Sequence, residues 1–250
     1  MVNVGLIGHG KAGMAVAEVL AVDPRYTLRW VARRQATGCG ETVVVGGVDV
    51  PLQGLAEGTW DAWLDASPVD AVVDFSQPDA VLSYGEALRQ RGVALVSAIS
   101  AYSPQQMDYV RSLGEHTRVM ASPNITLGIN FLILAAKLLR GIAPFADVEV
   151  LEQHFREKPE VSGTARKIAQ SLELDEERIT SLRLGGIVGH HEVIFGFPYQ
   201  TVRLIHNTIR REAFGTGAAF ALAELLNQPN GFYTFDDLLM ARVRHDLAAG

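Results

Sequence analysis

The chain has 250 residues, of which 48% are hydrophobic and 20% charged, and its 22 Lys and Arg against 28 Asp and Glu give a formal net charge of −6. This length allows one large or two small domains, the apolar fraction excludes a disordered chain, and no apolar run of about 18 residues predicts a membrane span. The single cysteine, Cys39, excludes a disulfide framework and a cysteine-rich metal site, and the acidic balance argues against general nucleic-acid binding. Because the first residues resemble a strand more than a signal peptide, we expect a cytoplasmic protein.

Short apolar runs alternate with helical patterns through the first half of the chain. The predicted strands are Val2–Gly8, Leu28–Ala32, Val43–Val45, Ala71–Phe75 and Val93–Ser97, and the predicted helices are Lys11–Leu20 and Asp79–Gln90. Strands that alternate with helices predict a parallel sheet with crossover helices, and hence the α/β class.

The pattern changes after a long apolar helix predicted at Thr126–Leu139. Polar and apolar residues then alternate in four predicted strands, and a last helix follows; these elements are Asp147–Gln153, Ile179–Leu184, Val188–Phe195, Thr201–Ile205 and Ala213–Leu226. Such alternation is typical of an antiparallel or mixed sheet with one solvated face. We therefore expect two domains that join near Ser122–Pro123, with the last helix folding back onto the first domain.

A glycine-rich loop follows the first predicted strand. Gly8-His9-Gly10-Lys11-Ala12-Gly13 matches G-x-G-x-x-G and opens a helix, which is the context that a dinucleotide site requires. Gly8 permits the tight turn, Gly10 lets the backbone approach a pyrophosphate, and Gly13 lets the helix and strand pack closely. The helix N-terminus then offers N–H groups to the anion. The alternative is a glycine-rich turn without a ligand.

Two arginines follow the second predicted strand, where an acid would bind the ribose hydroxyls of NAD. Arg33 and Arg34 stand there instead, and a guanidinium can pair with a 2′-phosphate. This favours NADPH, with NADH also possible. The alternative is a solvated end of the strand.

The densest polar segment of the chain runs from Glu152 to Ala165. Ser162 or Thr164 can cap the helix that begins there, and the backbone around them suits a carboxylate. Lys158 could supply a countercharge and His154 a group that titrates near neutral pH. These residues suit protonation of a substrate that is held by its carboxylate. The alternative is a capped helix after a solvated charged loop.

Other polar residues favour structural roles. We expect Asp74 to bond a neighbouring turn, His190 to be structural, and His206 and Arg211 to serve packing or an interface. No set of His, Cys and carboxylates has a metal-binding spacing, and neither a G-x-S-x-G elbow nor a kinase motif set occurs.

Together these motifs resemble dihydrodipicolinate reductase, also called 4-hydroxy-tetrahydrodipicolinate reductase, over nearly the whole chain. Besides the glycine loop, the matching segments are Asp74–Pro78, Ser122–Asn124, Gly128–Asn130, Glu152–His154, Lys158, Ser162–Ala165, Gly189–His191, His206, Arg211, Phe214 and Gly217–Ala218. The histidine, the lysine and the Ser-Gly-Thr-Ala run are the most specific of these.

The resemblance implies a Rossmann-type dinucleotide-binding domain, over residues 1–122 and 215–250. It also implies an α+β substrate-binding and oligomerisation domain with an open mixed sheet, over residues 123–214, and a homotetramer. The implied reaction is hydride transfer from NAD(P)H to a small cyclic imine or enamine carboxylate in lysine and diaminopimelate biosynthesis. A histidine or a lysine supplies the proton.

The resemblance also assigns roles to individual residues. His154 and Lys158 match the catalytic pair, and Ser162, Gly163 and Thr164 match the loop that binds the substrate carboxylate. The implied cofactor-binding residues are Gly8, His9, Gly10, Lys11, Ala12, Gly13, Arg33, Arg34, Phe75, Ser76, Ser97 and Asn124, although His9 is more typical of a spacer. No metal site is implied.

Three departures from the family pattern concern the substrate. Phe155 replaces a second histidine, Ser97-Ala98-Ile99-Ser100 replaces a G-T-T-G loop, and Pro159-Glu160-Val161 shortens the link to the Ser-Gly-Thr run. Phe155 and Ile99 cannot hydrogen-bond a carboxylate, so we hypothesise a substrate that is less polar at that position.

Three functions therefore remain open: the parent reductase, a diverged paralogue that reduces another cyclic imine carboxylate, and a catalytically silent dinucleotide-binding protein. Retention of both His154 and Lys158 argues against the last of these.

Overall fold

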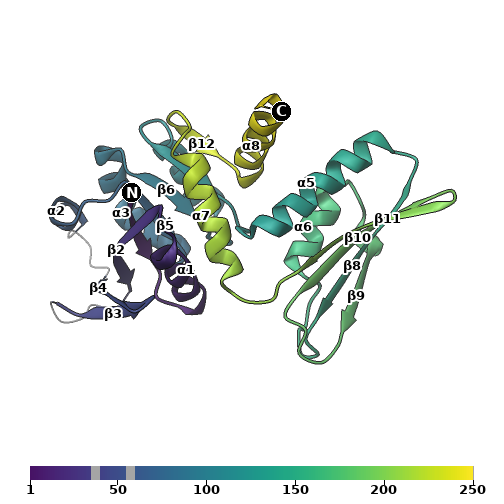
Figure 1. Ribbon diagram of the computed structural model, residues 1–250, viewed down its shortest axis with the longest axis horizontal. Helices are drawn as coiled ribbons and strands as arrows, with labels where there is room; N and C mark the ends of the chain where they lie inside the picture. Colours follow the sequence, from purple (N-terminus) through teal and green to yellow (C-terminus); the bar gives the residue numbers. More distant parts are fainter. Residues whose placement is uncertain (35–39, 55–59, 250) are drawn as a thin grey trace. The chain divides into compact units, whose positions relative to one another are not determined.

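A computed structural model describes residues 1–34, 40–54 and 60–249, so Cys39 lies outside the described residues. The chain divides into two compact units (Figure 1): unit 1 is Met1–Thr126 with Phe214–Gly250, and unit 2 is Leu127–Ala213. Within the described ranges, no helix has the length and apolar character needed to cross a membrane.

A parallel sheet forms the centre of unit 1, as the alternation of strands and helices predicts. Its strands are β1 (Val2–Ile7), β2 (Tyr26–Arg33), β3 (Thr42–Val45), β4 (Val48–Gly54), β5 (Ala71–Asp74), β6 (Ala94–Ser97), β7 (Arg118–Ala121) and β12 (Gly231–Tyr233). They lie in the order β12-β7-β6-β5-β1-β2-β4-β3. Only the β3–β4 pair among them is antiparallel. The expected Rossmann-like α/β class is thereby confirmed.

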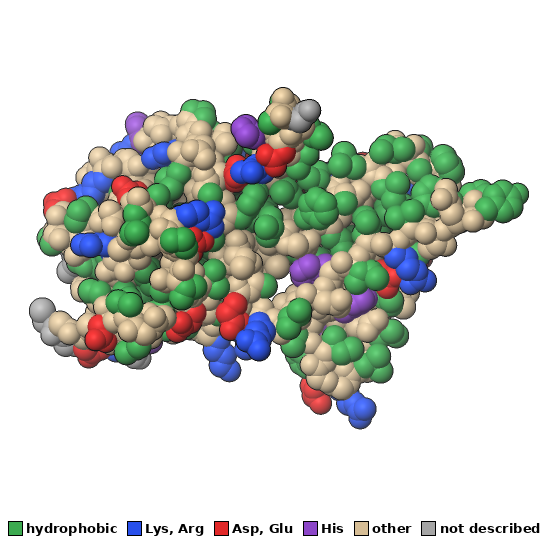
Figure 2. All heavy atoms as spheres, viewed as in Figure 1, with side chains coloured by type: hydrophobic (Ala, Val, Ile, Leu, Met, Phe, Trp, Pro, Cys, Tyr) green, Lys and Arg blue, Asp and Glu red, His purple; other side chains and the backbone are tan. Residues whose placement is uncertain are grey.

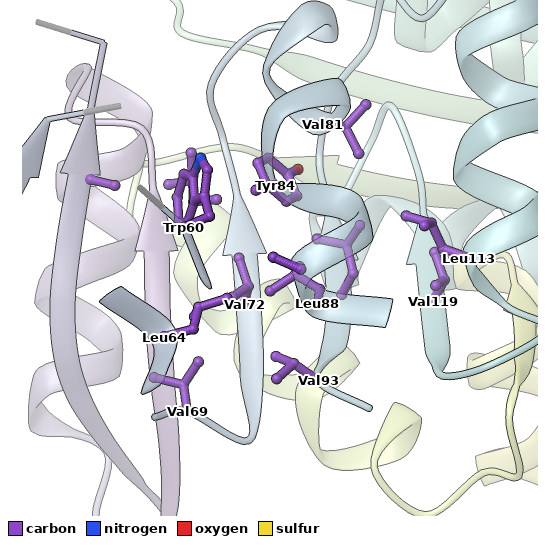
Figure 3. Close-up of a cluster of buried hydrophobic side chains, with 14 of the residues drawn as sticks. Trp60, Leu64, Val69, Val72, Val81, Tyr84, Leu88, Val93, Leu113 and Val119 are labelled. Carbon is purple, nitrogen blue, oxygen red and sulfur yellow. The ribbon is translucent and has the colours of Figure 1, made fainter. Parts of the chain in front are cut away.

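Helices cover this sheet. They are α1 (Lys11–Val22), α2 (Trp60–Ala66), a short 3-10 turn (Pro78–Ala80), α3 (Val81–Arg91), α4 (Pro104–Leu113), α7 (Ala213–Leu225) and α8 (Phe235–Ala249). Figure 3 shows side chains from α2, α3 and α4 packed with strand residues into one apolar cluster, in which Trp60, Tyr84 and Leu88 are almost fully buried. Trp60 also contacts Trp30 and Trp63.

Helix α7 returns to unit 1 and packs near α1. The Tyr26 hydroxyl donates to the Ala219 carbonyl oxygen at 2.7 Å, and Gly215 lies so close to Val19 that a Cβ atom would be 2.5 Å from its side chain. The expectation that residues 213–226 form the last helix is wrong, because β12 and α8 follow it.

Unit 2 is a mixed sheet with helices on one face (Figure 1). Its elements are α5 (Leu127–Ile142), β8 (Asp147–His154), α6 (Gly163–Ser171), a 3-10 turn (Glu176–Arg178), β9 (Ile179–Arg183), β10 (His190–Phe197) and β11 (Gln200–Asn207). The strand order is β11-β10-β8-β9, with β8 and β9 parallel and the other pairs antiparallel. Side chains of α5 and α6 pack with Val150, Val193 and Phe195 from the inner face. The expected mixed sheet is confirmed.

Candidate active-site residues of the two units

The proposed cofactor residues of unit 1 gather at one edge of its sheet. Gly8 follows β1, Arg33 ends β2, Phe75 follows β5 and Ser97 ends β6. These strands are adjacent and parallel, since Ile7 pairs with both Ala32 and Asp74, and Asp74 pairs with Ser97. The carboxyl edge of a parallel sheet is where doubly wound folds bind nucleotides.

The glycine loop fits tightly between its neighbours. Gly8 has φ +115°, which L side chains rarely adopt, and a Cβ atom there would lie 2.7 Å from the Phe75 carbonyl carbon. A Cβ atom on Gly13 would lie 2.0 Å from the Gly8 carbonyl oxygen. The glycines at these positions therefore let the backbone turn back over the start of α1.

The start of α1 can accept an anion. Gly10 is the N-cap residue, no side chain caps the helix, and its first turn contains no acid. A Cβ atom on Gly10 would have nothing within 4 Å, so space remains beside the backbone. His9 is half-buried and Lys11 is exposed in the same loop. This arrangement fits a pyrophosphate at the helix N-terminus.

Arg33 and Arg34 lie at the end of β2 as predicted, but Arg33 has a partner that the sequence interpretation missed. Its Nη2 lies 3.2 Å from Glu41 Oε2, in an ion pair between partly exposed side chains. Its Nε is buried without a hydrogen bond among the described residues. Arg34 is exposed. Glu41 precedes β3, eight residues after Arg33, and no motif in the sequence pairs the two residues.

A buried carboxylate orders the loop after β5. Asp74 accepts from the Ser76 backbone N–H at 2.8 Å and the Ser76 hydroxyl at 2.6 Å, which confirms its expected bond to a neighbouring turn. The Tyr84 hydroxyl also donates to it. Burial raises the pKa of Asp74, against the lowering effect of these hydrogen bonds. The network fixes the backbone that carries Phe75, whose ring lies 6.3 Å from that of Phe214.

The remaining proposed residues of unit 1 are held by local contacts. The Ser97 hydroxyl lies 2.9 Å from that of Tyr102, so it already has a partner within the unit. Ile99 is buried, with 7% of its surface exposed. The Asn124 backbone N–H donates to the Ser122 hydroxyl at 3.3 Å, and Asn124 Oδ1 accepts from the Thr126 N–H at 3.2 Å.

In unit 2 a polar row crosses the inner face of the sheet. His206 pairs with His191, His191 with Glu152, and Glu152 with Ser181, so one residue from each strand contributes. Because side chains alternate between the two faces of a strand, these four residues lie on the same inner face as the apolar residues beside them. The row lies beside His154, the last residue of β8.

His154 is nearly buried, and its two ring nitrogens have different surroundings. Nδ1 forms a hydrogen bond with Glu152 Oε2. Nε2 faces Gly189, where a Cβ atom would approach to 3.4 Å, and it forms no hydrogen bond with the residues that the structure describes. The ring lies 5.3 Å from that of His191. Nε2 is thus the nitrogen that can exchange a proton with a bound molecule.

The loop that carries Lys158 begins directly after His154. The Lys158 backbone N–H donates to the Phe155 carbonyl oxygen at 3.1 Å and closes a turn. Phe155 is 41% exposed, whereas Lys158 is half-buried. Gly163 is exposed, Thr164 half-buried, and a Cβ atom on Gly163 would meet nothing within 4 Å. Open backbone at the start of α6 suits a carboxylate.

The sequence allows either Ser162 or Thr164 to cap α6. The expectation that the Ser162 side chain caps the helix is wrong, and Thr164 lies within the helix. Ser162 is the N-cap residue, yet its side chain makes no capping hydrogen bond. Its hydroxyl lies 2.9 Å from His191 Nε2 instead. The histidine comes from a strand distant in sequence, and its contact with the Ser162 hydroxyl stands in place of the expected capping bond.

Figure 2 shows histidine side chains on the visible face of unit 2. His190 and His191 begin β10, and the buried His191 pairs with His206 of β11. Burial, together with the neighbouring His154 and His206, lowers the pKa of His191 to about 3. The His206 ring packs against Gly128, where a Cβ atom would approach to 2.7 Å, and Arg211 is exposed. His190 Nδ1 lies 2.7 Å from Asn207 Oδ1.

The sequence interpretation named neither Glu152 nor Arg183 as functional. Arg183 Nη2 lies 2.8 Å from Glu152 Oε1. The alternation within β8 contained a signal, since it places Glu152 on the same face as His154. In the described part of the chain, no group of three or more His, Cys, Asp and Glu side chains could hold a metal ion.

Comparisons with known proteins cover both units. Residues 2–125 match the family model described as dihydrodipicolinate reductase, N-terminus, and residues 124–239 match the model for its C-terminus. The 4-hydroxy-tetrahydrodipicolinate reductase of Halorhodospira halophila is 29% identical, over 95% of this chain and 98% of its own. That of Caldanaerobacter subterraneus is 30% identical, over 92% of this chain and 95% of its own.

Solved structures show the same fold. Dipicolinate-bound dihydrodipicolinate reductase from Paenisporosarcina superposes with a TM-score of 0.75 at 22% identity, over 94% of this chain and 97% of its own. An amine dehydrogenase from Mycobacterium smegmatis gives a TM-score of 0.68 at 13% identity, over 94% of this chain and 95% of its own.

Proposed function

Since this chain belongs to the dihydrodipicolinate reductase family of NAD(P)H-dependent oxidoreductases, we propose that it reduces 4-hydroxy-tetrahydrodipicolinate, a cyclic imine carboxylate, in lysine biosynthesis. The observation that carries the proposal is the placement of His154 in unit 2. Its Nδ1 is hydrogen-bonded to Glu152, whereas its Nε2 forms no hydrogen bond with the described residues. The loop that carries Lys158 and Ser162–Thr164 begins directly after His154. Unit 1 is the cofactor domain, and unit 2 is the substrate-binding and oligomerisation domain.

The residues of unit 1 fit a dinucleotide. The bound cofactor supplies the hydride for a ring carbon of the substrate. Gly8, Gly10 and Gly13 let the loop and the uncapped start of α1 surround a pyrophosphate. Arg33 and Arg34 bind the 2′-phosphate and favour NADPH. The Arg33 ion pair with Glu41 weakens this preference, so NADH is accepted as well.

The remaining proposed cofactor residues lie in this loop or at and after the ends of other strands of the sheet. His9, Lys11 and Ala12 belong to the loop, Phe75 and Ser76 line the nicotinamide side, and Ser97 and Asn124 complete the set.

The residues of unit 2 bind the substrate and supply the proton. Lys158 and the loop of Ser162, Gly163 and Thr164 hold a carboxylate, because a cation and the N-terminus of a helix both stabilise an anion. His154 donates the proton from Nε2. A positioned acid of this kind contributes about 10²- to 10⁴-fold to the rate.

The test is NADPH oxidation with the lysine-pathway intermediate generated by its synthase. We expect turnover in the wild type, and a kcat about 10²-fold lower in His154→Ala, the range that general acid catalysis supplies. Lys158→Ala should lower kcat/KM, because the substrate carboxylate loses its countercharge. Lys167→Ala, on α6, is the matched control and keeps wild-type rates. Tight NADPH binding without turnover would instead support a catalytically silent protein.

Phe155 and Ile99 favour a second candidate, a paralogue that reduces a less polar cyclic imine carboxylate. Phe155 offers an exposed apolar ring and Ile99 a buried apolar side chain, so neither can bond a second carboxylate. The discriminating substrate is Δ1-piperideine-2-carboxylate. Its exclusive turnover supports the paralogue, and Phe155→His should then raise activity toward the lysine-pathway intermediate.

The open face of the unit 2 sheet supports assembly as a homotetramer. It carries the apolar residues Leu182 and Ile205, which are 39% and 54% exposed, and no helix of unit 2 lies on it (Figure 1). Because we propose a role in lysine biosynthesis, we also propose that the protein acts in the cytoplasm. Light scattering on the purified chain tests the tetramer.

A further inference from the structure

A fully buried carboxylate lies two residues before the proposed acid. Glu152 has no exposed surface. The residues before it on the inner face of β8, Val148 and Val150, belong to the apolar core. A charged group is rarely buried in this way unless charged or hydrogen-bonding partners surround it. Its partners therefore indicate what it does.

One oxygen of Glu152 holds the ring of His154. Burial alone would raise the pKa of the Glu152 carboxyl, but hydrogen bonds from Arg183, Ser181 and His154 outweigh it and lower the pKa to about 2. At neutral pH the carboxylate is ionised and can only accept hydrogen bonds. The proton between Oε2 and Nδ1 therefore belongs to the histidine, which leaves Nε2 to exchange a proton.

The other oxygen of Glu152 binds the loop that follows. Oε1 accepts from the Ser181 hydroxyl at 2.7 Å, from Arg183 Nη2 at 2.8 Å and from the Ser162 backbone N–H at 3.3 Å. The same carboxylate thus contacts both the ring of His154 and the first residue of the carboxylate loop.

Arg183 extends these contacts to the rest of the loop. Its Nε donates to the Lys158 carbonyl oxygen at 3.0 Å, and its Nη2 donates to the Glu160 carbonyl oxygen at 2.8 Å. A planar guanidinium can make these bonds together, whereas an ammonium cannot match their geometry. The segment that carries Lys158 is therefore tied to the same ion pair.

We propose that Glu152 and Arg183 are a pair of positioning residues: Glu152 fixes the tautomer of His154, and Arg183 fixes the Lys158–Ser162 loop. The proposal rests on the proposed function for its kinetic consequences. Neither residue touches substrate in this scheme. The charged and titratable groups that face His154 are Glu152 on its own strand, Arg183 on β9 and His191 on β10.

The first test does not need activity. In ¹⁵N spectra of histidine-labelled protein, we expect neutral His154 to carry its proton on Nδ1, and this tautomer to be lost in Glu152→Gln. Observation of the Nε2–H tautomer in the folded wild type would overturn the proposal, whether or not the enzyme reduces the proposed substrate. Because the wild type alone can decide it, a variant that fails to fold leaves the test intact.

Kinetics provide the second test. Glu152→Gln should lower kcat by about 10²-fold and move the alkaline limb of the kcat/KM profile to lower pH, since the charge that stabilises the protonated ring is gone. Glu152→Asp keeps the charge and should restore the position of that limb. Arg183→Lys should raise KM by about tenfold or more with a smaller change in kcat, as the carboxylate loop loosens.

The matched control is Glu149→Gln on the same strand, where the half-exposed carboxylate bonds Thr180 at 2.9 Å. It should keep the wild-type pH profile and rate. An unchanged profile in Glu152→Gln would contradict the pairing, whereas a wild type inactive on the proposed substrate would count against the proposed function alone.

Discussion

Gly10 and Gly13 belong to one loop but differ in the space around a Cβ atom. At Gly13 the atom would lie 2.0 Å from the Gly8 carbonyl oxygen, whereas at Gly10 nothing lies within 4 Å. Gly10 also has φ −86° and ψ −179°, which any L residue adopts. Alanine at Gly13 should therefore damage the fold, and alanine at Gly10 should mainly damage ligand binding.

The cost at Gly13 follows from the distance. Real Cβ atoms essentially never approach closer than 3.0 Å, so the loop and helix must separate by at least 3.0 − 2.0 = 1.0 Å. Val16 and Leu20 anchor α1 in the core with no exposed surface, which resists the movement. Overpacking of this kind costs about 1–3 kcal/mol, and each kcal/mol lowers Tm by about 2–4 °C in a chain of this size.

At Gly10 the expected loss is in affinity. The new methyl group occupies the space where the pyrophosphate approaches the start of α1, and each charge-assisted hydrogen bond lost there costs about 1.5–3 kcal/mol. The Kd for NADPH should rise by about 10- to 150-fold, while Tm should fall less than in Gly13→Ala, because alanine at the N-cap costs only a little stability.

Fluorescence titration with NADPH and thermal unfolding measure the two quantities. Gly10→Ala with wild-type affinity would refute the placement of the pyrophosphate beside this backbone. Gly13→Ala with an unchanged Tm would refute the packing argument. Only the first result bears on the proposed cofactor site.

Two further predictions concern stability. The pKa of His191 is about 3 in the folded protein, against 6.5 for an ordinary histidine. Between pH 6.5 and pH 3 the unfolded chain therefore binds a proton at this residue that the folded protein does not bind. The free energy of unfolding should fall as the pH drops through this range, by up to about 1.4 kcal/mol per pH unit. Denaturant titrations at pH 7 and pH 5 should show a smaller fall in His191→Gln. Ser103 caps α4 by accepting from the Gln106 N–H at 3.2 Å, and Ser103→Ala should lower stability by about 1 kcal/mol in thermal melts.

Each of these predictions has a control in the same chain. His245→Gln, on the exposed side of α8, should leave the pH dependence unchanged. If His191→Gln and His245→Gln behave alike, His191 is not the source of the acid sensitivity. Ser112→Ala, within α4, removes a hydroxyl that bonds its own helix at 2.7 Å and should cost less than Ser103→Ala. Equal effects would argue against the cap.

Strong periodicity was enough to predict most of the architecture. The alternation of strands and helices up to Ser97 and the alternating residues after Asp147 yielded the two kinds of sheet that the structure contains. The missed strands are β4, β7 and β12. Strands β7 and β12 are short, and all three are strands because neighbouring strands pair with them. The missed α4 did carry a local signal, the capping box at Ser103.

The candidate site was predictable only where its parts are contiguous in sequence. His154, Lys158 and the Ser-Gly-Thr run lie within one segment, so their common location needed no tertiary information. Glu41, Arg183 and His191 act across strands, 8 to 31 residues away from their partners. Long-range pairing of this kind leaves no trace in local spacing.

The return of residues 214–250 to unit 1 has a consequence for synthesis of the protein. When the first 126 residues have emerged from the ribosome, β7 still lacks its neighbour β12, and Tyr26 lacks its acceptor on α7. An open edge strand invites pairing with other chains. Unit 2 is contiguous in sequence, so it can finish folding before unit 1, whose last segment is synthesised after it.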